Sequence, residues 1–313
     1  MTPSISGIHH VTAIAGEPQP NVDFYAGVLG LRVVKLTVNF DDPVTYHLYY
    51  GDERGRPGSV MTFFPWPGAP KGVRGAGQAT ATSFSVPLGS LAFWVERLTA
   101  AGLEVLGPIP RFEERVLSFH DPDGLALEIV GDERGDVRTP WERGSVPPEH
   151  AIRGFHGVML TEKSHAQTAP LLTETLGFRL LAQDENRHRY AAGDGAPGGI
   201  VDLLDSPGLE RGLVAVGTVH HVAWRTPTDE EQAGWGSTLA KRGLQVTPVA
   251  DRHYFHSIYF REPGGVLFEI ATDQPGFTVD EPVEALGRSL RLPPWLEPRR
   301  AQLTQTLPAL RLP

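Results

Sequence analysis

The sequence of 313 residues contains no cysteine. This absence excludes disulfides, thiolate metal sites, iron–sulfur clusters and a cysteine nucleophile together. Any metal site must therefore be built from His, Asp or Glu side chains.

The sequence also lacks an excess of positive charge. Lys and Arg number 28 against 37 Asp and Glu, a formal net charge of −9, and no basic run stands out that would neutralise phosphates. No segment approaches the roughly 20 apolar residues that cross a bilayer, and the first residues lack a signal-peptide pattern. We therefore expect a cytoplasmic protein without a nucleic-acid or membrane partner, and homo-oligomer formation stays open.

The residues that are present suit a globular chain with many turns. Hydrophobic residues make up 40% of the sequence and charged residues 21%, which is enough apolar material for packed cores. The 35 Gly and 28 Pro are scattered between short apolar runs, a distribution typical of short strands joined by turns. The length predicts two domains or an internal repeat.

An internal repeat is visible along the chain. The segment Gly7–Ile14 (GIHHVTAI) recurs as GFHGVML from Gly154, and Phe119–Ile129 recurs as Phe260–Ile270. Repeats of this kind define four related units. The units cover residues 5–67, 76–134, 151–208 and 214–273.

The four units form two halves, an N-terminal domain (5–134) and a C-terminal domain (151–273), followed by a tail (274–313). In each unit a short apolar strand precedes a helix and three further strands, the last of which follows a turn. The sequence therefore predicts an α+β fold of four βαβββ units.

Equivalent positions of the four units differ in their chemistry. The first strands carry, in order, His10, Ala81, Gly157 and His221. The last strands carry Phe63, Glu128, Leu203 and Glu269 near the end of the apolar run. Only two units offer an imidazole and only two offer a carboxylate, so the pairing of the units decides whether a metal site forms.

Sequential pairing of the units gives two incomplete sites with two ligands each. Pairing unit one with unit four instead gathers His10, His221 and Glu269 in one cavity and leaves Glu128 without a metal role. Two imidazoles and one carboxylate with open positions suit non-haem Fe(II), with Mn(II) as the alternative. Phe63 is predicted to stand where a fourth ligand would lie, which keeps room for exogenous ligands.

The repeated layout resembles the vicinal oxygen chelate superfamily of glyoxalases, fosfomycin and bleomycin resistance proteins and extradiol dioxygenases. The resemblance covers residues 5–273. Three motifs, GIHHVT from Gly7, VHHVAW from Val219 and LFEIATD from Leu267, are similar to hydroquinone-type ring-cleaving dioxygenases. The resemblance implies two open barrel-like sheets, with units one and four sharing the metal site.

The resemblance also implies roles for individual residues. Fe(II) would bind His10, His221 and Glu269. Tyr259, His220 and Arg252 would be catalytic, and Thr12 and His9 would line the substrate pocket. Strand alternation places Thr12 and Tyr259 on the ligand face, whereas His9 and His220 need a bulge to approach it.

The implied activity is that of a non-haem Fe(II) extradiol-type dioxygenase, which would open the ring of a substituted hydroquinone or related phenol with O2 during aromatic hydrocarbon catabolism. Two alternatives stay open. One is a glyoxalase-type isomerase or lyase, against which Phe63 counts, and the other is a non-catalytic resistance protein that sequesters a ligand.

Overall fold

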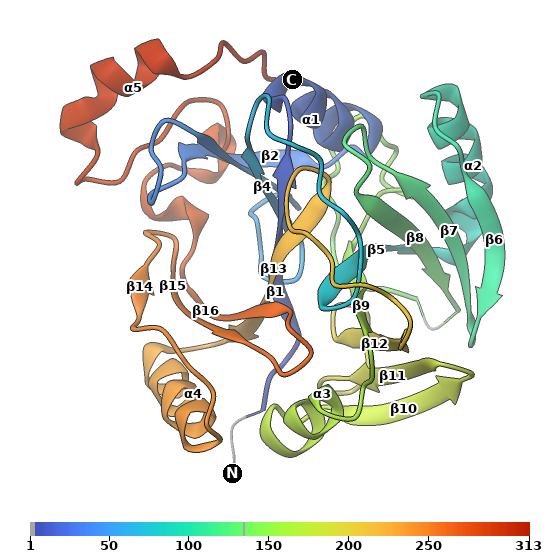
Figure 1. Ribbon diagram of the computed structural model, residues 1–313. Coiled ribbons are helices and arrows are strands. Elements are labelled where there is room, and N and C mark those ends of the chain that lie inside the picture. The colour runs from blue at the N-terminus through green and yellow to red at the C-terminus, as the bar shows by residue number, and fades with distance from the viewer. Residues whose placement is uncertain (1–3, 134) are drawn as a thin grey trace.

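Two curled eight-stranded sheets form the body of the molecule (Figure 1). The computed structural model describes residues 4–133 and 135–313. One sheet has the strand order β14-β15-β16-β13-β1-β4-β3-β2 and joins units four and one, and the other has the order β10-β11-β12-β9-β5-β8-β7-β6 and joins units three and two. The predicted α+β fold and the pairing of unit one with unit four are confirmed.

Each unit supplies one helical segment and four strands. Unit one contains β1 (Ile8–Ala15), α1 (Pro18–Val22), η1 (Asp23–Val28), β2 (Arg32–Val38), β3 (Tyr46–Gly51) and β4 (Val60–Pro65). Unit two contains β5 (Gln78–Pro87), η2 (Leu88–Ser90), α2 (Leu91–Ala100), β6 (Leu106–Arg111), β7 (Glu114–His120) and β8 (Ala126–Asp132).

The second half of the chain repeats this order. Unit three contains β9 (Gly154–Glu162), α3 (Thr168–Pro170), η3 (Leu171–Thr175), β10 (Arg179–Asp184), β11 (Arg187–Ala191) and β12 (Ile200–Asp205). Unit four contains β13 (Thr218–Thr226), α4 (Asp229–Lys241), β14 (Ala250–Asp251), β15 (Phe255–Arg261) and β16 (Leu267–Pro275). The tail contains η4 (Phe277–Val279), η5 (Val283–Ala285), η6 (Glu297–Arg299) and α5 (Arg300–Thr306). The division into domains at 5–134 and 151–273 stays a prediction.

Helix α4 shows how local sequence fixes an element. The Thr228 hydroxyl accepts a hydrogen bond from the backbone N–H of Glu231 at 3.2 Å, and three acidic residues occupy the first turn, where they favour the helix dipole. Trp235 and Leu239 fall on one face of the helix and are buried. The helix thus covers one side of the sheet that carries β13, β15 and β16.

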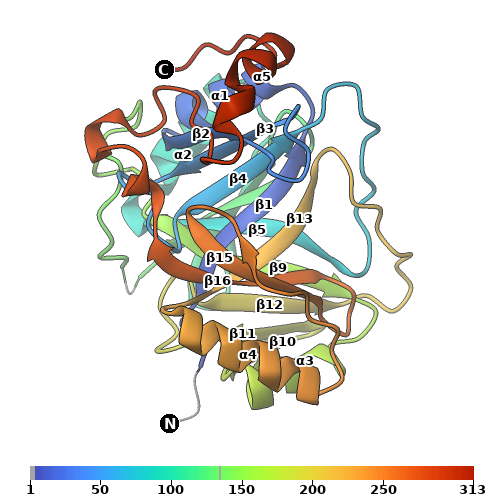
Figure 2. The same ribbon diagram turned by 90° about the vertical axis from the view of Figure 1, so that its left-hand side faces the viewer.

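The units are joined through their first strands. Strand β1 pairs antiparallel with β13, and β5 pairs antiparallel with β9. The linkers that follow units one and three run side by side, as Figure 2 shows, and Val73 forms a bridge with Leu213 there. The tail packs back on unit one, where the Tyr46 hydroxyl donates to the Pro308 carbonyl at 2.9 Å.

The strand pair β1–β13 carries a bulge in each partner. The register skips His9 between Ile8 and His10, and it skips His220 between Val219 and His221. A bulge rotates the following side chains relative to the sheet. The expectation that both His-His pairs need such an irregularity agrees with this register.

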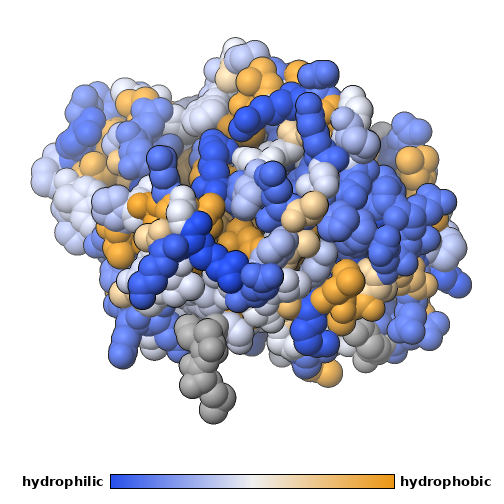
Figure 3. Space-filling model, turned by 60° about the horizontal axis from the view of Figure 1, so that its bottom comes forward, coloured by the Kyte–Doolittle hydropathy of each residue, from blue (hydrophilic) through white to orange (hydrophobic). Residues whose placement is uncertain are grey.

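The molecular surface is mixed in character. The face in Figure 3 is largely hydrophilic, with small hydrophobic areas between charged side chains. Among the described residues, no helix is both long enough and apolar enough to span a membrane.

Candidate metal centre

Three side chains from three strands converge in the sheet that units one and four share. The Nε2 atoms of His10 on β1 and His221 on β13 lie 3.3 Å apart. Oε2 of Glu269 on β16 lies 3.4 Å from the first nitrogen and 3.0 Å from the second. All three residues are buried, at 2%, 5% and 0% exposure. The structure thus brings together the three residues that the sequence proposed as ligands.

The neighbouring histidines orient the two imidazoles. Nδ1 of His9 lies 2.8 Å from Nδ1 of His10, and Nδ1 of His220 lies 2.7 Å from Nδ1 of His221. Each contact occupies the Nδ1 side of the inner ring and turns its Nε2 toward Glu269. A hydrogen bond to the second ring nitrogen fixes the tautomer and direction of a ligating imidazole.

Glu269 has one oxygen satisfied and one open. Its Oε1 accepts a 2.5 Å hydrogen bond from the Ser257 hydroxyl, whereas the buried Oε2 has no hydrogen-bond partner. Burial alone would raise the pKa of Glu269, but the adjacent His10 and His221 more than offset this and hold its pKa well below the usual value. An ionised, unsatisfied oxygen beside two imidazole nitrogens is a donor set that fits Fe(II) or Mn(II).

A cavity of about 350 Å³ opens beside these groups. Its walls combine the imidazoles of His10, His220 and His221 with aromatic side chains that include Phe64 and Trp66. A mostly apolar pocket with a few convergent polar groups is the usual form of a small-molecule site.

Arg252 and Tyr259 lie together in this cavity. The Arg252 Nε donates to the Tyr259 hydroxyl at 3.2 Å, and its Nη1 donates to the Asp41 carboxylate at 2.9 Å. Burial raises the pKa of Tyr259, and although burial alone would lower the pKa of Arg252, Tyr259 and Asp41 raise it above its ordinary value. At neutral pH the pair therefore presents a protonated phenol and a guanidinium to the cavity.

Two predicted substrate contacts lie behind the cavity wall. His9 packs against Phe255 with ring centroids 5.1 Å apart and does not line the cavity. The Thr12 hydroxyl lies 3.0 Å from that of Thr62, which in turn lies 2.8 Å from Nε2 of His47. Thr12 does not line the cavity and is linked to it by hydrogen bonds through these two side chains.

Sequence reasoning missed His47 and Tyr49. Both lie on β3 and line the cavity, and the Tyr49 hydroxyl is 2.8 Å from Nδ1 of His47. Their alternate spacing on one strand face was a usable signal. This spacing does not indicate which element of unit four His47 and Tyr49 would contact.

The structure corrects the position assigned to Phe63. Glu269 pairs with Tyr259 across β15–β16, and the equivalent pairing in unit one joins Thr62 to Tyr49 across β3–β4. The prediction that Phe63 fills the fourth-ligand position is wrong, because Thr62 stands there.

Phe63 points to the opposite face. It is fully buried with its ring centroid 4.5 Å from that of Tyr25. A shift of one residue in register moves a side chain from one face of a strand to the other. The same shift in unit three replaces Leu203 by Asp202, which pairs with Arg189 as Glu269 pairs with Tyr259.

The second sheet fills the corresponding space with ion pairs. Glu128 accepts two 2.7 Å hydrogen bonds from Arg111 and one of 2.6 Å from the Ser83 hydroxyl. Asp202 accepts a 2.7 Å hydrogen bond from Arg189 Nε. A bidentate guanidinium satisfies a carboxylate that lacks a metal. Arg111 and Arg252 align in sequence, yet only Arg111 binds the last-strand carboxylate.

Two other groups of His and acidic residues lie close together. In one, the carboxylate of Glu114 is held by Arg189 at 2.7 Å. In the other, the rings of His165 and His188 stack 3.6 Å apart and His165 binds Asp205 at 2.7 Å. Glu114 also has a buried oxygen without a hydrogen-bond partner, but Arg189 pairs with the same carboxylate. His10 and His221 line a cavity beside Glu269, so the site of His10, His221 and Glu269 is the better metal candidate.

Comparisons with known proteins agree with this geometry. The family model described as "Glyoxalase/Bleomycin resistance protein/Dioxygenase superfamily" matches residues 7–129 and 154–270. The chain is 51% identical to the Bacillus subtilis protein named "Putative ring-cleaving dioxygenase MhqO", over 98% of this chain and 97% of that protein. It is 37% identical to the "Chlorohydroquinone/hydroquinone 1,2-dioxygenase" of Sphingobium indicum, over 97% and 96% of the two chains.

A solved structure is similar over the whole chain. A crystal structure from Bacillus subtilis described as a "putative dioxygenase" is 48% identical and superimposes with a TM-score of 0.95, covering 100% of this chain and 99% of that one. The sequence identity and the shared fold both extend over the whole chain. The chain belongs to the glyoxalase/bleomycin resistance/dioxygenase superfamily and, within it, to the branch of hydroquinone-type ring-cleaving dioxygenases.

Proposed function

We propose that this chain is a non-haem Fe(II) dioxygenase of the extradiol type that opens the ring of a substituted hydroquinone or related phenol with O2. The observation that carries the proposal is the convergence of His10, His221 and Glu269 around a buried carboxylate oxygen with no hydrogen-bond partner. The names of the relatives support the class of reaction.

His10, His221 and Glu269 would hold the metal. When bound, Fe(II) supplies a redox-active centre with open positions for both an electron-rich ring and O2. Thr62 in place of a second carboxylate is consistent with those open positions, because a hydroxyl already bound to Thr12 and His47 is a weaker ligand.

The surrounding residues would bind and orient the ring. The Tyr259 hydroxyl accepts a hydrogen bond from Arg252, which leaves its own proton free to donate to a substrate oxygen. The Arg252 guanidinium, anchored by Asp41, would stabilise negative charge on that oxygen. His220 lines the same cavity and is placed to accept or return a proton.

The shape and polarity of the cavity suit one substituted ring. Phe64 and Trp66 give it aromatic walls, and its volume of about 350 Å³ lies near the lower end for small-molecule sites. The proposal includes a cytoplasmic role in aromatic catabolism.

Oxygen uptake tests the proposal directly. Protein loaded anaerobically with Fe(II) is mixed with methylhydroquinone in air-saturated buffer, and we expect oxygen consumption with loss of the aromatic absorbance. No uptake with any hydroquinone or catechol would overturn it. Isomerisation of a glutathione adduct without oxygen would indicate a glyoxalase-type enzyme instead, and tight ligand retention without turnover would indicate a sequestering protein. Metal analysis of freshly purified protein distinguishes iron from manganese.

A further inference from the structure

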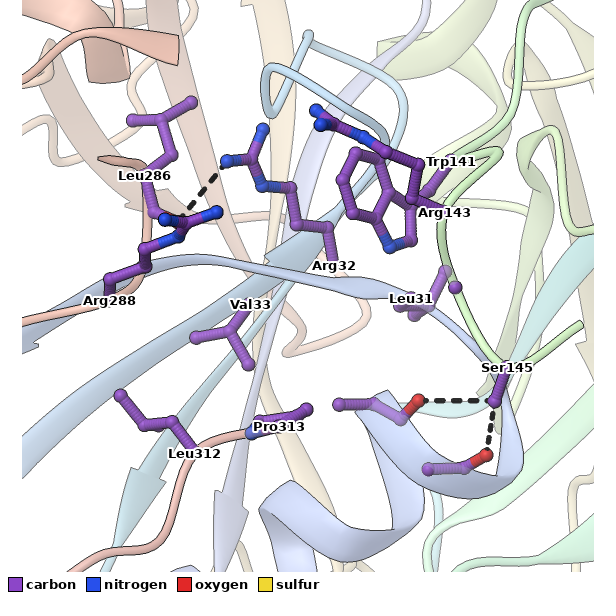
Figure 4. Close-up of a pocket in the computed structure, with 14 residues that line it drawn as sticks. Leu31, Arg32, Val33, Trp141, Arg143, Ser145, Leu286, Arg288, Leu312 and Pro313 are labelled. Carbon is purple, nitrogen blue, oxygen red and sulfur yellow. Dashed lines mark hydrogen bonds between the residues drawn. The ribbon is translucent and has the colours of Figure 1, made fainter. Parts of the chain in front are cut away.

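A second cavity, of about 390 Å³, lies where three distant parts of the chain meet at edge strand β2 (Figure 4). Its lining comes from the end of η1 and the start of β2, from residues 141–145 between the two halves, and from the tail at 286–288 and 312–313. It shares no lining residue with the cavity of the metal centre.

Three guanidinium groups surround this second cavity, those of Arg32, Arg143 and Arg288. Arg32 is 6% exposed, and its hydrogen bonds go to backbone carbonyls, at 2.5 Å to Glu53 and 3.3 Å to Leu286. Within the described part of the chain, no carboxylate lies within 4.0 Å of Arg32. Carbonyl groups satisfy its N–H groups, and the carboxylates of Glu53 and Glu281 act on its charge only from beyond ion-pair distance.

The other two cations add to this charge. Arg143 lies 3.6 Å from the Glu53 carboxylate in a pair whose side chains are 62% and 44% exposed, and such pairs contribute little. Arg288 makes no ion pair with any residue that the structure describes. Burial is the main cause that lowers the pKa of Arg32. Arg143 and Arg288 lower it further, and Glu53 and Glu281 offset part of this shift. A pKa displaced in this direction indicates a site that would be stabilised by a negative charge.

An indole ring lies close to two of the cations. The guanidinium carbons of Arg32 and Arg143 lie 4.8 and 4.9 Å from the Trp141 ring centroid, and Figure 4 shows the three side chains together. Gly144 permits this arrangement, because a Cβ there would lie 2.8 Å from Trp141 Cδ1. The indole holds the two charges close together at low conformational cost.

The tail segment is fixed against β2 by close backbone contact. Gly287 has a φ of +76°, and a Cβ there would lie 1.9 Å from the Val33 carbonyl oxygen. Only glycine fits such an approach. Arg288 is consequently held at the cavity rim, opposite a floor that includes Val33, Leu286 and Leu312.

We propose that this cavity is a binding site for a small organic anion, a carboxylate or phosphate group carried on an apolar body. Guanidinium groups match the geometry of these oxyanions, and the apolar floor suits the hydrocarbon part. The formal net charge of the chain is −9, so a group of three arginines with a single, exposed ion pair departs from the charge of the protein as a whole. The proposal does not depend on the reaction at the metal centre.

Calorimetric titration of the metal-loaded protein with sodium benzoate tests the proposal. Because benzoate can also bind the metal, the comparison is between variants of the second cavity. We expect Arg143→Gln and Arg288→Gln each to lower the benzoate affinity of one saturable site about tenfold, because each substitution removes one hydrogen bond to a charged group. Arg299→Gln, which removes the same charge from an exposed position in η6, is expected to leave binding unchanged.

Three outcomes would overturn the assignment. The first is an equal benzoate affinity in the wild type and both cavity variants. The second is no saturable binding by about 10 mM at low ionic strength, a limit near the weak end of specific affinities. The third is an equal affinity for inorganic phosphate and benzoate. The last result would show that the apolar floor contributes nothing. Thermal melting of each variant in the absence of ligand verifies that folding is unchanged.

Discussion

Thr62 and Glu269 occupy the same position in the two units that surround the metal centre. Thr62 pairs with Tyr49 on the next strand and with Thr12, two residues after His10. Glu269 pairs with Tyr259 and with Ala223, two residues after His221. The duplicated scaffold therefore offers a fourth ligand position, and this chain fills it with a hydroxyl.

Replacing Thr62 by Glu is expected to close that position. A carboxylate there would add a fourth protein ligand, so metal content should be retained while oxygen uptake with hydroquinones falls at least tenfold, as an exogenous ligand site is lost. Thr62→Val removes the hydroxyl without adding a ligand. It therefore separates the effect of losing the hydroxyl from the effect of adding a carboxylate. Full oxygen uptake by Thr62→Glu, with the metal bound, would contradict the assignment.

Removal of one ligand candidate should release the metal. We expect His221→Ala to lower the iron content about tenfold, whereas Glu128→Gln, in the equivalent position of the second sheet, should leave it intact because Arg111 already satisfies that carboxylate. Elemental analysis of both purified variants measures the difference. Equal metal loss in the two would argue against a site shared by units one and four.

The Tyr259 hydroxyl is expected to matter for turnover and not for metal retention. Tyr259→Phe removes the group that Arg252 orients, and loss of one such donor at a developing charge lowers kcat about a hundredfold. Tyr190→Phe, on β11 of the other sheet, is the matched control. Steady-state oxygen uptake at equal iron content gives kcat for both, and an unchanged kcat in Tyr259→Phe would remove this residue from the mechanism.

A buried pair of carboxyl groups should make stability depend on pH. Glu162 and Glu262 are 1% and 2% exposed, and the Thr168 hydroxyl lies 2.8 and 2.5 Å from an oxygen of each. Burial, followed by the charge of Glu262, raises the pKa of Glu162 to about 8. A raised folded-state pKa means that this group's stabilisation is present below its unfolded pKa and is lost as the pH rises toward 8.

Glu162→Gln keeps a hydrogen-bonding group without the charge. Between pH 5 and pH 8 the free energy of unfolding should decrease in both proteins. The decrease should be smaller in Glu162→Gln than in the wild type, by roughly 1 to 3 kcal/mol. Urea unfolding at both pH values measures this, with the exposed Glu17→Gln as control. Parallel pH profiles for the wild type and Glu162→Gln would show that the pair does not control stability.

The comparison of equivalent positions identified the ligand candidates from the sequence. His10 and His221 stood at the same place in two units, and Glu269 stood in the last strand of one of them, so counting imidazoles and carboxylates favoured the pairing of units one and four. That inference succeeded because side-chain chemistry is read directly from residue identity. It needed no knowledge of side-chain direction beyond strand alternation.

The error at Phe63 has a different origin. The end of an apolar run served as the reference point for aligning the last strands, which matched Phe64 with Ile270. Strand pairing instead gives Phe63 the position of Ile270, so the apolar run of unit one extends one residue further. Strand register is set by backbone pairing with the neighbouring strands. A one-residue error in register matters little for the bounds of a strand. It matters greatly for its side chains, because it moves each of them to the opposite face of the sheet.

By itself, the sequence determined the four βαβββ units, the residues able to hold a metal and the absence of thiolate chemistry, because these follow from local patterns and composition. Only the tertiary structure decided that Thr62 faces the site, that Arg252 joins Asp41 to Tyr259, and that Arg32, Arg143 and Arg288 share one cavity. The direction of Thr62 follows from strand register, whereas the Arg252–Asp41 contact and the three-arginine cavity bring together residues far apart in the chain. Strand pairing and the folding back of the tail set these arrangements, and no local pattern encodes them.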